Sequence, residues 1–514
     1  MELIKGDDKP HRSWGESIRS FYNRKVITML FLGFSAGVPI LLIFSTLSAW
    51  LREADVTRGA IGFFSWAALG YGFKFIWAPI IDKLPLPGLT AAMGQRRSWL
   101  LVAQFAVIAS IALMALTDPK EDLMFMALAA VALGFASATQ DIVIDAYRIE
   151  SADMDMQGLL SSTYVAGYRI GMVVAGAGAL EIAGLIDVID GYDYNAWRIS
   201  YLAMAGVMLV GVATTFMIPE PEREDVHSVH LNSLTDYLRF LGLFVIFVAT
   251  FIGMFFLCAD LVSSAKASLI EGDMNKRLAG FLTGSARMLT SLGIAGFVAH
   301  IVVRTGIVPR QMFRETYLAP FIDLLERYGK VALLILALVA TYRISDIVMG
   351  VMANVFYIDL GFEKQEIGRI SKGFGLGMTI AGTFIGGLIC VRYGVLRTLF
   401  LGAFLSAITN VLFSILAGLG HNIPALMLVI SADNLSGGIA TAAFIAWLSS
   451  LTSKSFTATQ YAVFSSVMLL FPKLIGGYSG VMVESVGYST FFIGTAVIGI
   501  VPLTLIVLLG RRTT

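Results

Sequence analysis

Two carboxylates stand one helical turn apart inside an otherwise apolar stretch of the chain. The run from Gly134 to Arg148 reads GFASATQDIVIDAYR, and its acids are Asp141 and Asp145. Residues four apart lie on the same face of a helix. A charge at the centre of a bilayer costs roughly 2.5–3.5 kcal/mol on insertion scales, so such acids usually face a bundle interior or a water-filled cavity. The pair therefore predicts either a face that handles protons or substrate, together with Gln140, or two structural acids held in salt bridges.

The two acids differ in what we expect of them. Asp145 lies toward the end of the predicted helix, where it is in reach of Arg96 or Arg97 and a salt bridge would latch one conformation. The structural role is therefore favoured for Asp145. For Asp141 both interpretations stay open.

The composition is that of a polytopic membrane protein. Of the 514 residues, 57% are hydrophobic and only 14% are charged, and the mean hydropathy is +0.78, which is outside the range of soluble domains. The net charge of +1 gives no reason to expect a nucleic-acid partner. Cys258 and Cys390 lie far apart in apolar segments, so neither a disulfide nor a metal site is predicted. The polar first 25 residues show no cleavable signal peptide.

Fourteen apolar stretches reach the length of roughly 20 residues that a helix needs to cross a bilayer. They are 26–50, 59–80, 98–117, 122–147, 157–184, 197–218, 239–263, 279–303, 331–357, 365–390, 396–418, 423–450, 458–483 and 488–510. Lysine and arginine gather before the first, after the second, eighth and tenth of them, and at the C-terminus. Because cytoplasmic loops carry an excess of these residues, both termini are expected in the cytoplasm.

An internal repeat divides these spans into two halves. The segments 50–62 and 356–368 share an aromatic helix end, a short turn and an Ile-Gly pair that enters the next helix. Internal repeats are typical of secondary transporters. The predicted fold is all-α, with a six-helix bundle at 26–218 and a second one at 331–510.

The rest of the chain consists of a cytoplasmic tail and a long linker. The tail is 1–25 and the linker is 219–330. Within the linker we expect a transmembrane hairpin at 239–303. An amphipathic helix at 310–328 is expected to lie along the cytoplasmic membrane surface.

Further polar side chains fall inside the predicted spans. They include the cations Lys74, Arg169, Arg343 and Lys372 and, outside 122–147, the acids Asp346 and Asp433, the latter followed by Asn434. The structural alternative for each is a buried pair, such as Arg343 with Asp346 at i, i+3 or Arg169 with Asp141. An excess of cations at mid-depth suggests an anionic substrate. An acid whose pKa responds to burial and to a nearby arginine suggests proton coupling.

The layout resembles the major facilitator superfamily. Members of that superfamily carry an acidic and basic motif in the loop after the second helix. Asp82, Gly94, Arg96 and Arg97 match this motif loosely, with a long spacer that contains prolines. Asp82, Arg96, Arg97 and Asp145 are therefore the candidates for a conformational latch.

Several phrases of the sequence resemble the AmpG family of muropeptide permeases. They are SATQDIV followed by Asp145-Ala146, GYRIGM at 167–172, FKFIWAP at 73–79 with Asp82, SKSFTATQ at 453–460, DNLSGG at 433–438 and Arg343-x-x-Asp346. The resemblance covers roughly 26–219 and 331–510. The hairpin matches no fixed element of the family, and Asp433 stands where a glutamate is expected.

This resemblance implies a specific transport function. The expected protein is a monomeric, multi-pass permease of the inner membrane of a Gram-negative bacterium. It would import N-acetylglucosaminyl-1,6-anhydro-N-acetylmuramic acid, with or without a peptide stem, for cell-wall recycling, driven by protons and linked to β-lactamase induction. The expected partners are this substrate, protons and membrane lipids, with no cofactor, metal or catalytic residue.

The same reading assigns candidate roles to the buried polar residues. The proton-coupling candidates are Asp141, Asp346 and Asp433. The substrate-binding candidates are Lys74, Gln140, Tyr168, Arg169, Arg343, Lys372, Asn434 and Gln460. Cations would hold carboxylates, and amides would hold sugar hydroxyls.

Three alternatives compete with this reading. The first is transport of another anionic solute, either acetyl-coenzyme A or an oligopeptide; oligopeptide carriers normally show ExxER on the first helix, whereas 26–50 has no charge. The second is a transport-dead membrane sensor. The third is an intramembrane aspartyl enzyme, which is disfavoured because such enzymes place their two acids on separate helices, one of them in a GxGD sequence.

Overall fold

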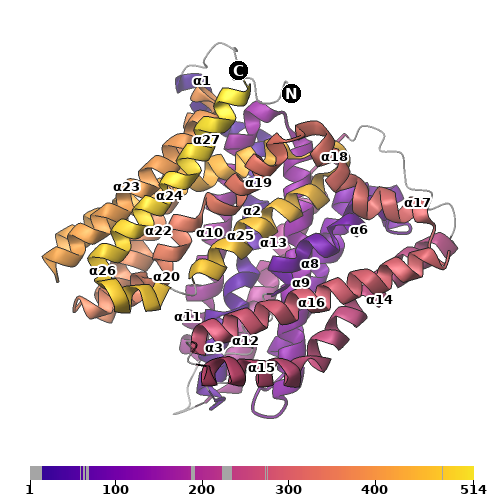
Figure 1. The fold of residues 1–514 in the computed structure, drawn as a ribbon, viewed down its shortest axis with the longest axis horizontal. Helices are drawn as coiled ribbons and strands as arrows, with labels where there is room; N and C mark the ends of the chain where they lie inside the picture. The colour runs from indigo at the N-terminus through magenta and orange to yellow at the C-terminus, as the bar shows by residue number, and fades with distance from the viewer. Residues whose placement is uncertain are drawn as a thin grey trace. The chain divides into compact units, whose positions relative to one another are not determined.

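The computed structural model describes residues 14–57, 60, 61, 64, 69–186, 192–222, 234–272, 274, 276–476 and 479–513. Within these ranges the regular structure is helical, without a strand (Figure 1). The chain divides into two compact units. The larger unit combines 1–224 with 328–514, and the smaller one is 225–327.

The described part of the chain holds fewer candidate membrane spans than the fourteen predicted. Among the described residues, eleven helices are long and apolar enough, or twelve when a pair bent by 44° at Leu257–Ala259 counts as one span. Two of the fourteen predicted spans are missing from this count. The span 59–80 falls partly outside the described residues, and 458–483 appears as a 20-residue helix that ends at Gly476.

The first half of the larger unit contains six helical segments in its described part, and several of them are interrupted. They are α2 (Arg24–Ile43) with α3 (Ser45–Glu53); α5 (Leu69–Phe73), η4 (Lys74–Ile76) and α6 (Ala78–Lys83); α8 (Gln95–Ala115); α9 (Leu123–Ser151); α10 (Gln157–Val173), η6 (Val174–Gly178) and α11 (Ala179–Ile186); and α12 (Tyr194–Val207) with α13 (Leu209–Met217). Short helices α1 (Trp14–Arg19), η2 (Ser20–Tyr22), α7 (Leu89–Met93) and η5 (Met154–Met156) flank them.

The second half repeats this plan with six more segments in the described ranges. They are α19 (Val331–Thr341) with α20 (Ile344–Asp359); α21 (Lys364–Ile367), η8 (Gly368–Phe374) and α22 (Gly375–Tyr393); α23 (Val395–Leu419); α24 (Ile423–Leu451); η9 (Lys454–Phe456) with α25 (Thr457–Gly476); and α26 (Ser479–Ile498) with α27 (Ile500–Thr513). Helices suit such an apolar chain because they satisfy every backbone polar group within the segment.

Glycines let α2 and α10 approach so closely that their backbones touch. A Cβ atom on Gly37 would lie 2.0 Å from the carbonyl oxygen of Tyr168, and one on Gly167 would lie 2.0 Å from that of Leu30. Small residues at a helix interface give this kind of packing in membrane proteins. The contact fixes the positions of Tyr168 and of the following Arg169 along the axis of α2. On the other side, Gly438 of α24 packs in the same way against α22.

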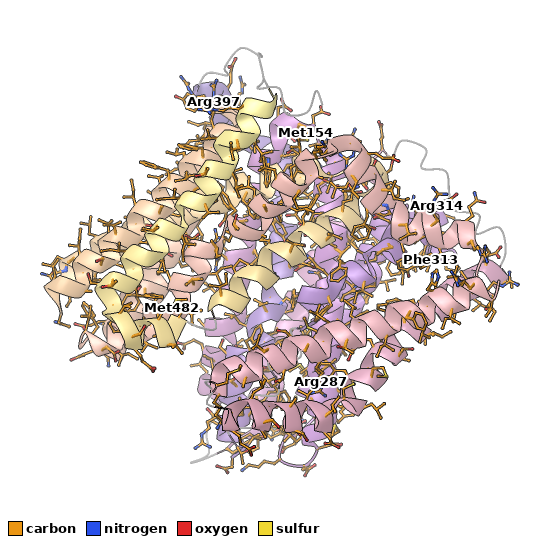
Figure 2. The ribbon with its side chains drawn as sticks, in the orientation of Figure 1. Met154, Arg287, Phe313, Arg314, Arg397 and Met482 are labelled. Carbon is orange, nitrogen blue, oxygen red and sulfur yellow. The ribbon has the colours of Figure 1, made fainter. Side chains whose placement is uncertain are left out.

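The smaller unit is a helical hairpin followed by a further helix. Its elements are α14 (Leu234–Leu257), α15 (Ala259–Glu271), α16 (Lys276–Arg304), α17 (Arg310–Phe313), η7 (Arg314–Leu318) and α18 (Ala319–Tyr328). Arg287 of α16 (Figure 2) donates from Nε to the carbonyl oxygen of Phe255 at 2.6 Å, beside the bend between α14 and α15. The segment 310–328 is helical in three consecutive pieces. Its position on a membrane surface stays a prediction.

Candidate functional site

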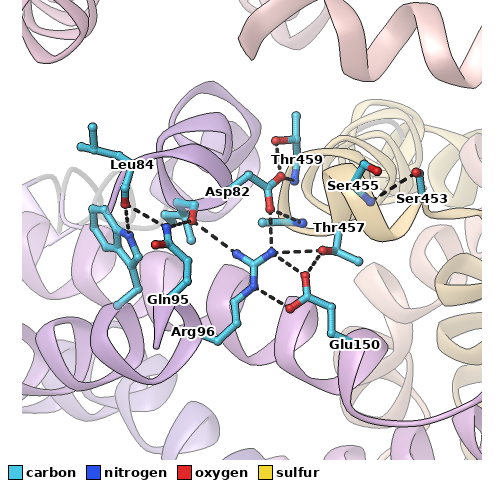
Figure 3. Close-up of polar contacts among 12 residues, drawn as sticks. Asp82, Leu84, Gln95, Arg96, Glu150, Ser453, Ser455, Thr457 and Thr459 are labelled. Atoms are coloured by element: carbon cyan, nitrogen blue, oxygen red, sulfur yellow. Dashed lines mark hydrogen bonds and ion pairs between the residues drawn. The ribbon is translucent and has the colours of Figure 1, made fainter. Parts of the chain in front are cut away.

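A cluster of buried charges joins the two halves where α6 ends and α25 begins (Figure 3). Arg96 is fully buried and donates to Glu150 through both Nε (2.9 Å) and Nη2 (2.6 Å). Its Nη2 also lies 2.8 Å from Asp82 Oδ1. This bidentate, charge-assisted geometry is among the strongest hydrogen-bonding arrangements in proteins. One arginine therefore holds two acids of the first half together.

The same cluster holds the start of α25, which belongs to the second half. Asp82 accepts hydrogen bonds from the backbone N–H groups of Ala458 (3.1 Å) and Thr459 (2.8 Å) and from the Thr459 hydroxyl (2.6 Å). Arg96 Nη2 donates to Thr457 Oγ1 at 3.0 Å. A carboxylate at a helix N-terminus satisfies free N–H groups and is favoured by the helix dipole. We call Asp82, Arg96, Glu150, Thr457 and Thr459 the latch cluster.

Arg97, the fourth residue of the predicted motif, faces away from the second half. Its side chain donates to the carbonyl oxygens of Thr215 and Phe216, both at 3.2 Å, at the end of α13. Glu220 accepts from the backbone N–H groups of Arg96 (2.7 Å) and Arg97 (3.0 Å), so it caps α8. Burial raises the pKa of Glu220, while these two N–H groups oppose the rise. Glu220 thus positions the helix that presents Arg96.

A second inter-half cluster is centred on Arg148, which the sequence did not single out. Arg148 is fully buried; its Nη2 lies 3.2 Å from Asp145 Oδ1, and its Nη1 donates to Ser449 of α24 at 2.7 Å. Its guanidinium also lies over the ring of Tyr461 of α25, 5.2 Å from the centroid. Lys74 Nζ is 3.7 Å from the other oxygen of Asp145. We call Lys74, Asp145, Arg148, Ser449 and Tyr461 the Arg148 cluster.

The predicted bridge from Asp145 to Arg96 or Arg97 is therefore wrong. Asp145 is paired with Arg148 and Lys74 instead. The reason is local geometry, since Arg148 is three residues further on the same helix. Glu150 lies closer to the end of α9 and forms the ion pair with Arg96.

Asp141 and Gln140 are buried next to this cluster with little hydrogen bonding. Asp141 is 7% exposed and Gln140 is fully buried. In the described part of the chain, Asp141 Oδ1 and both polar atoms of the Gln140 amide have no hydrogen-bond partner. The charged groups that act on Asp141 are Lys74 and Asp145. Buried polar atoms without a partner are costly, so Asp141 and Gln140 stay candidates for binding a proton or the solute.

In the second half, the predicted pair of Arg343 and Asp346 is present. Arg343 Nη1 lies 3.5 Å from Asp346 Oδ2 and donates to Thr441 Oγ1 at 2.6 Å. Asp433 accepts from Thr409 Oγ1 at 3.4 Å and acts electrostatically on Asp346. Both members of the Arg343–Asp346 pair are partly exposed, by 23% and 18%. Neither side chain is therefore fully enclosed by the protein.

The other candidates occupy different environments. Asn434 Oδ1 accepts from Thr379 at 2.8 Å, and Gln460 Oε1 accepts from the Ser453 N–H at 2.7 Å. Tyr168 is partly buried and acts electrostatically with both Asp141 and Arg169. The structural alternative for Arg169, a pair with Asp141, is absent from the ion pairs that the structure describes. The side chain of Lys372 lies outside the described residues.

Tight packing closes the same end of the bundle between α10 and α22. A Cβ atom on Gly158 would lie 2.5 Å from Cys390 Cβ, and one on Gly387 would lie 2.4 Å from Ser162 Oγ. Together with the two clusters, this seam joins the halves at one end. Asp141 and Arg169, which take part in no described ion pair, lie deeper along α9 and α10. This arrangement suits a carrier that binds a solute between two halves and exposes it to one side at a time.

Comparison with known proteins agrees with this geometry. The anhydromuropeptide permease of Escherichia coli K12 is 28% identical over 497 residues, which cover 96% of this chain and 82% of that protein. A transporter of Rickettsia felis named AmpG 4 is 27% identical over 493 residues, covering 96% and 98%. The resemblance to the AmpG permeases is thereby confirmed. A family model described as acetyl-coenzyme A transporter 1 also matches residues 25–276.

Solved structures of known transporters share the fold of this chain. The proton:xylose symporter XylE, bound to 6-bromo-6-deoxy-D-glucose, matches 98% of this chain and 97% of its own with a TM-score of 0.58 and 11% identity. The transporter FucP in its outward conformation matches 96% and 99% with a TM-score of 0.58 and 9% identity. Both belong to the major facilitator superfamily. The chain therefore has the fold of these transporters, and its sequence is similar to those of the AmpG permeases.

Proposed function

We propose that this protein is a proton-coupled importer of N-acetylglucosaminyl-1,6-anhydro-N-acetylmuramic acid and its peptide derivatives. The observation that carries the proposal is the similarity to an anhydromuropeptide permease across 96% of the chain. The buried polar groups fit such a solute, because its carboxylates need cations and its sugar hydroxyls and amides need hydrogen-bonding side chains. Import from periplasm to cytoplasm would supply cell-wall recycling and, through the imported fragments, β-lactamase induction.

The direction of transport follows from the charge of the loops. If the lysine- and arginine-rich loops face the cytoplasm, both termini and the latch cluster lie on that side. The inter-half contacts at this end would then close the pathway toward the cytoplasm. A periplasmic solute would reach Arg169, Arg343 and Asp141 from the opposite side. Rocking of the halves would transfer it.

Asp141 is the group that we assign to the proton. It is buried, one of its oxygens has no described partner, and its charged neighbours are Lys74 and Asp145. A proton on Asp141 removes the cost of burying an unpaired charge. Asp346 and Asp433 form a second pair of acids in the other half and are the alternative proton sites.

The decisive experiment is uptake into proteoliposomes. Labelled N-acetylglucosaminyl-anhydromuropeptide should accumulate in wild-type vesicles under an inward proton gradient. Asp141→Asn should lose this accumulation but retain exchange of labelled for unlabelled solute, because exchange needs no net proton transfer. Accumulation by Asp141→Asn with an unchanged pH dependence would contradict the assignment of the proton.

The match to the acetyl-coenzyme A transporter family provides the second candidate function. Acetyl-coenzyme A is also an anion, so the same arginines suit it. A competition experiment distinguishes the two candidate functions. Under our proposal, added acetyl-coenzyme A should leave the uptake of anhydromuropeptide unchanged. Failure of wild-type vesicles to move either solute would favour a transport-dead sensor.

A further inference from the structure

Two arginines from the two halves act on one another across the space between them. Arg169 lies on α10 of the first half, and Arg343 lies between α19 and α20 of the second. Arg343 is near enough to act electrostatically on Arg169. The helix α10 also packs against α24, whose Thr441 accepts a hydrogen bond from Arg343. The two guanidinium groups therefore face a common region.

Both arginines carry N–H donors for which the described residues show no acceptor. A guanidinium carries five N–H donors. Arg343 uses Nη1 for both Thr441 and Asp346, and no contact of its Nη2 or Nε appears among the described residues. The hydrogen bond recorded for Arg169 is a weak one, from Nη1 to the sulfur of Met172 at 3.9 Å. Both side chains are partly exposed.

Two fully buried arginines of the larger unit have more and closer partners than Arg169 and Arg343. Arg96 and Arg148 are fully buried, and each contacts carboxylates and hydroxyls at 2.6–3.2 Å. By contrast, Arg169 has no carboxylate partner among the described contacts, and the Nε and Nη2 donors of Arg343 have no described acceptor. An anion between the two arginines would supply an acceptor to both.

We propose that Arg169 and Arg343 form a two-sided clamp for one carboxylate of the solute. The proposal rests on the proposed function and specifies which group of the solute both halves recognise. Arg343 is free to take a second carboxylate, because its contact with Asp346 at 3.5 Å is longer than the 2.7–2.9 Å of a tight charge-assisted bond. A carboxylate bound by both arginines contacts both halves. Its binding therefore favours the arrangement in which the two halves lie closer together.

The chemistry of the solute makes this clamp testable. In the peptide-free disaccharide, the carboxylate is that of the lactyl ether of the muramic ring. In peptide derivatives this carboxyl is an amide, and the nearest free carboxylates belong to the amino acids. The clamp therefore requires a carboxylate on a flexible arm. A disaccharide whose lactyl group is a simple amide has the same sugars but lacks that charge.

The test compares binding of the disaccharide and of its lactyl amide to purified full-length protein by calorimetry. The wild type should prefer the carboxylate by at least about tenfold, as expected for hydrogen bonds to a charged group. Arg169→Gln and Arg343→Gln should each reduce this preference to less than about threefold, mainly by weakening carboxylate binding. The control is Arg397→Gln at an exposed arginine near the start of α23 (Figure 2), which should keep the wild-type preference.

The outcomes separate the clamp from the function on which it rests. If the wild type binds both ligands equally, or if either variant keeps the full preference, the clamp is overturned while the transport function stands. If the wild type binds neither ligand, the proposed function fails and the clamp fails with it. Unchanged binding of the lactyl amide by each variant shows that the variant is folded. The two substitutions together should cost less than the sum of their separate effects, because they remove partners of the same group.

Discussion

Asp82 holds the start of α25, so removal of its carboxylate should loosen the closed end of the bundle. Three of its hydrogen bonds cross between the halves, to the N–H groups of Ala458 and Thr459 and to the Thr459 hydroxyl. Its contact with Arg96 lies within the first half and persists when the halves separate. Hydrogen bonds to a charged group contribute about 1.5–3 kcal/mol. Asp82→Ala should therefore favour opening by a similar amount, a rise of roughly 10- to 150-fold in the open population.

The assay uses a cysteine that the chain already contains. Cys390 is buried in the seam between α22 and α10, where it packs against Gly158. In a Cys258→Ser background it is the remaining thiol, since the sequence has 2 cysteines. A maleimide reaches it only when the halves separate, so the labelling rate follows the open population. Asp82→Ala should label faster by the factor given above.

The matched control is another aspartate that caps a helix. Asp122 accepts from the Phe125 N–H at 2.8 Å at the start of α9, at the other end of that helix and within one half. Asp122→Ala loses a cap of similar strength, about 0.5–2 kcal/mol, but no contact between halves. Its labelling rate should stay within about twofold of the wild type. Equal rates for the two variants would show that Asp82 does not hold the halves together.

Two further predictions follow from neighbouring contacts. Arg148→Gln should speed the labelling of Cys390 at least as much as Asp82→Ala does. Loss of one partner from a buried ion pair costs about 3–5 kcal/mol, and the substitution also removes the contacts to Ser449 and Tyr461. An unchanged labelling rate would contradict this prediction. Burial raises the pKa of the Glu220 carboxyl in the folded protein. The stability that this carboxyl contributes is therefore fully present below its pKa in the unfolded chain, and it is lost as the pH rises through its pKa in the folded protein. The melting temperature of Glu220→Gln should therefore rise relative to wild type between about pH 4 and 7, whereas a constant difference would refute this.

The long uninterrupted helices could be predicted from the sequence. The predicted spans 396–418 and 423–450 fall inside α23 and α24, because apolar runs of this length leave a membrane chain few alternatives. The interruptions were missed. The span 331–357 is divided at Arg343, whose side chain turns to Asp346 and Thr441. Local hydropathy carries no signal for such a break.

The candidate site was predictable where its partners are close in sequence. Asp82 and Arg96 were found because a loop motif links them, and Arg343 with Asp346 because they are one turn apart. Arg148 was missed because it resembles an ordinary basic residue at a helix end. Its partner Ser449 is 301 residues away. Only the folded chain shows that this cation is buried between the halves.

The Arg148 cluster gives a physical route from a proton to the contact between the halves. Lys74, Asp141, Asp145 and Arg148 carry two positive and two negative charges, which cancel when both acids are ionised. A proton on Asp141 leaves this set with one net positive charge. The excess favours an anion in the space between the halves, and by thermodynamic linkage a bound anion favours the proton equally. Because Arg148 also binds Ser449 of the second half, the same charge acts on the contact that closes the pathway. Proton and anionic solute are therefore expected to bind cooperatively, whichever arrives first.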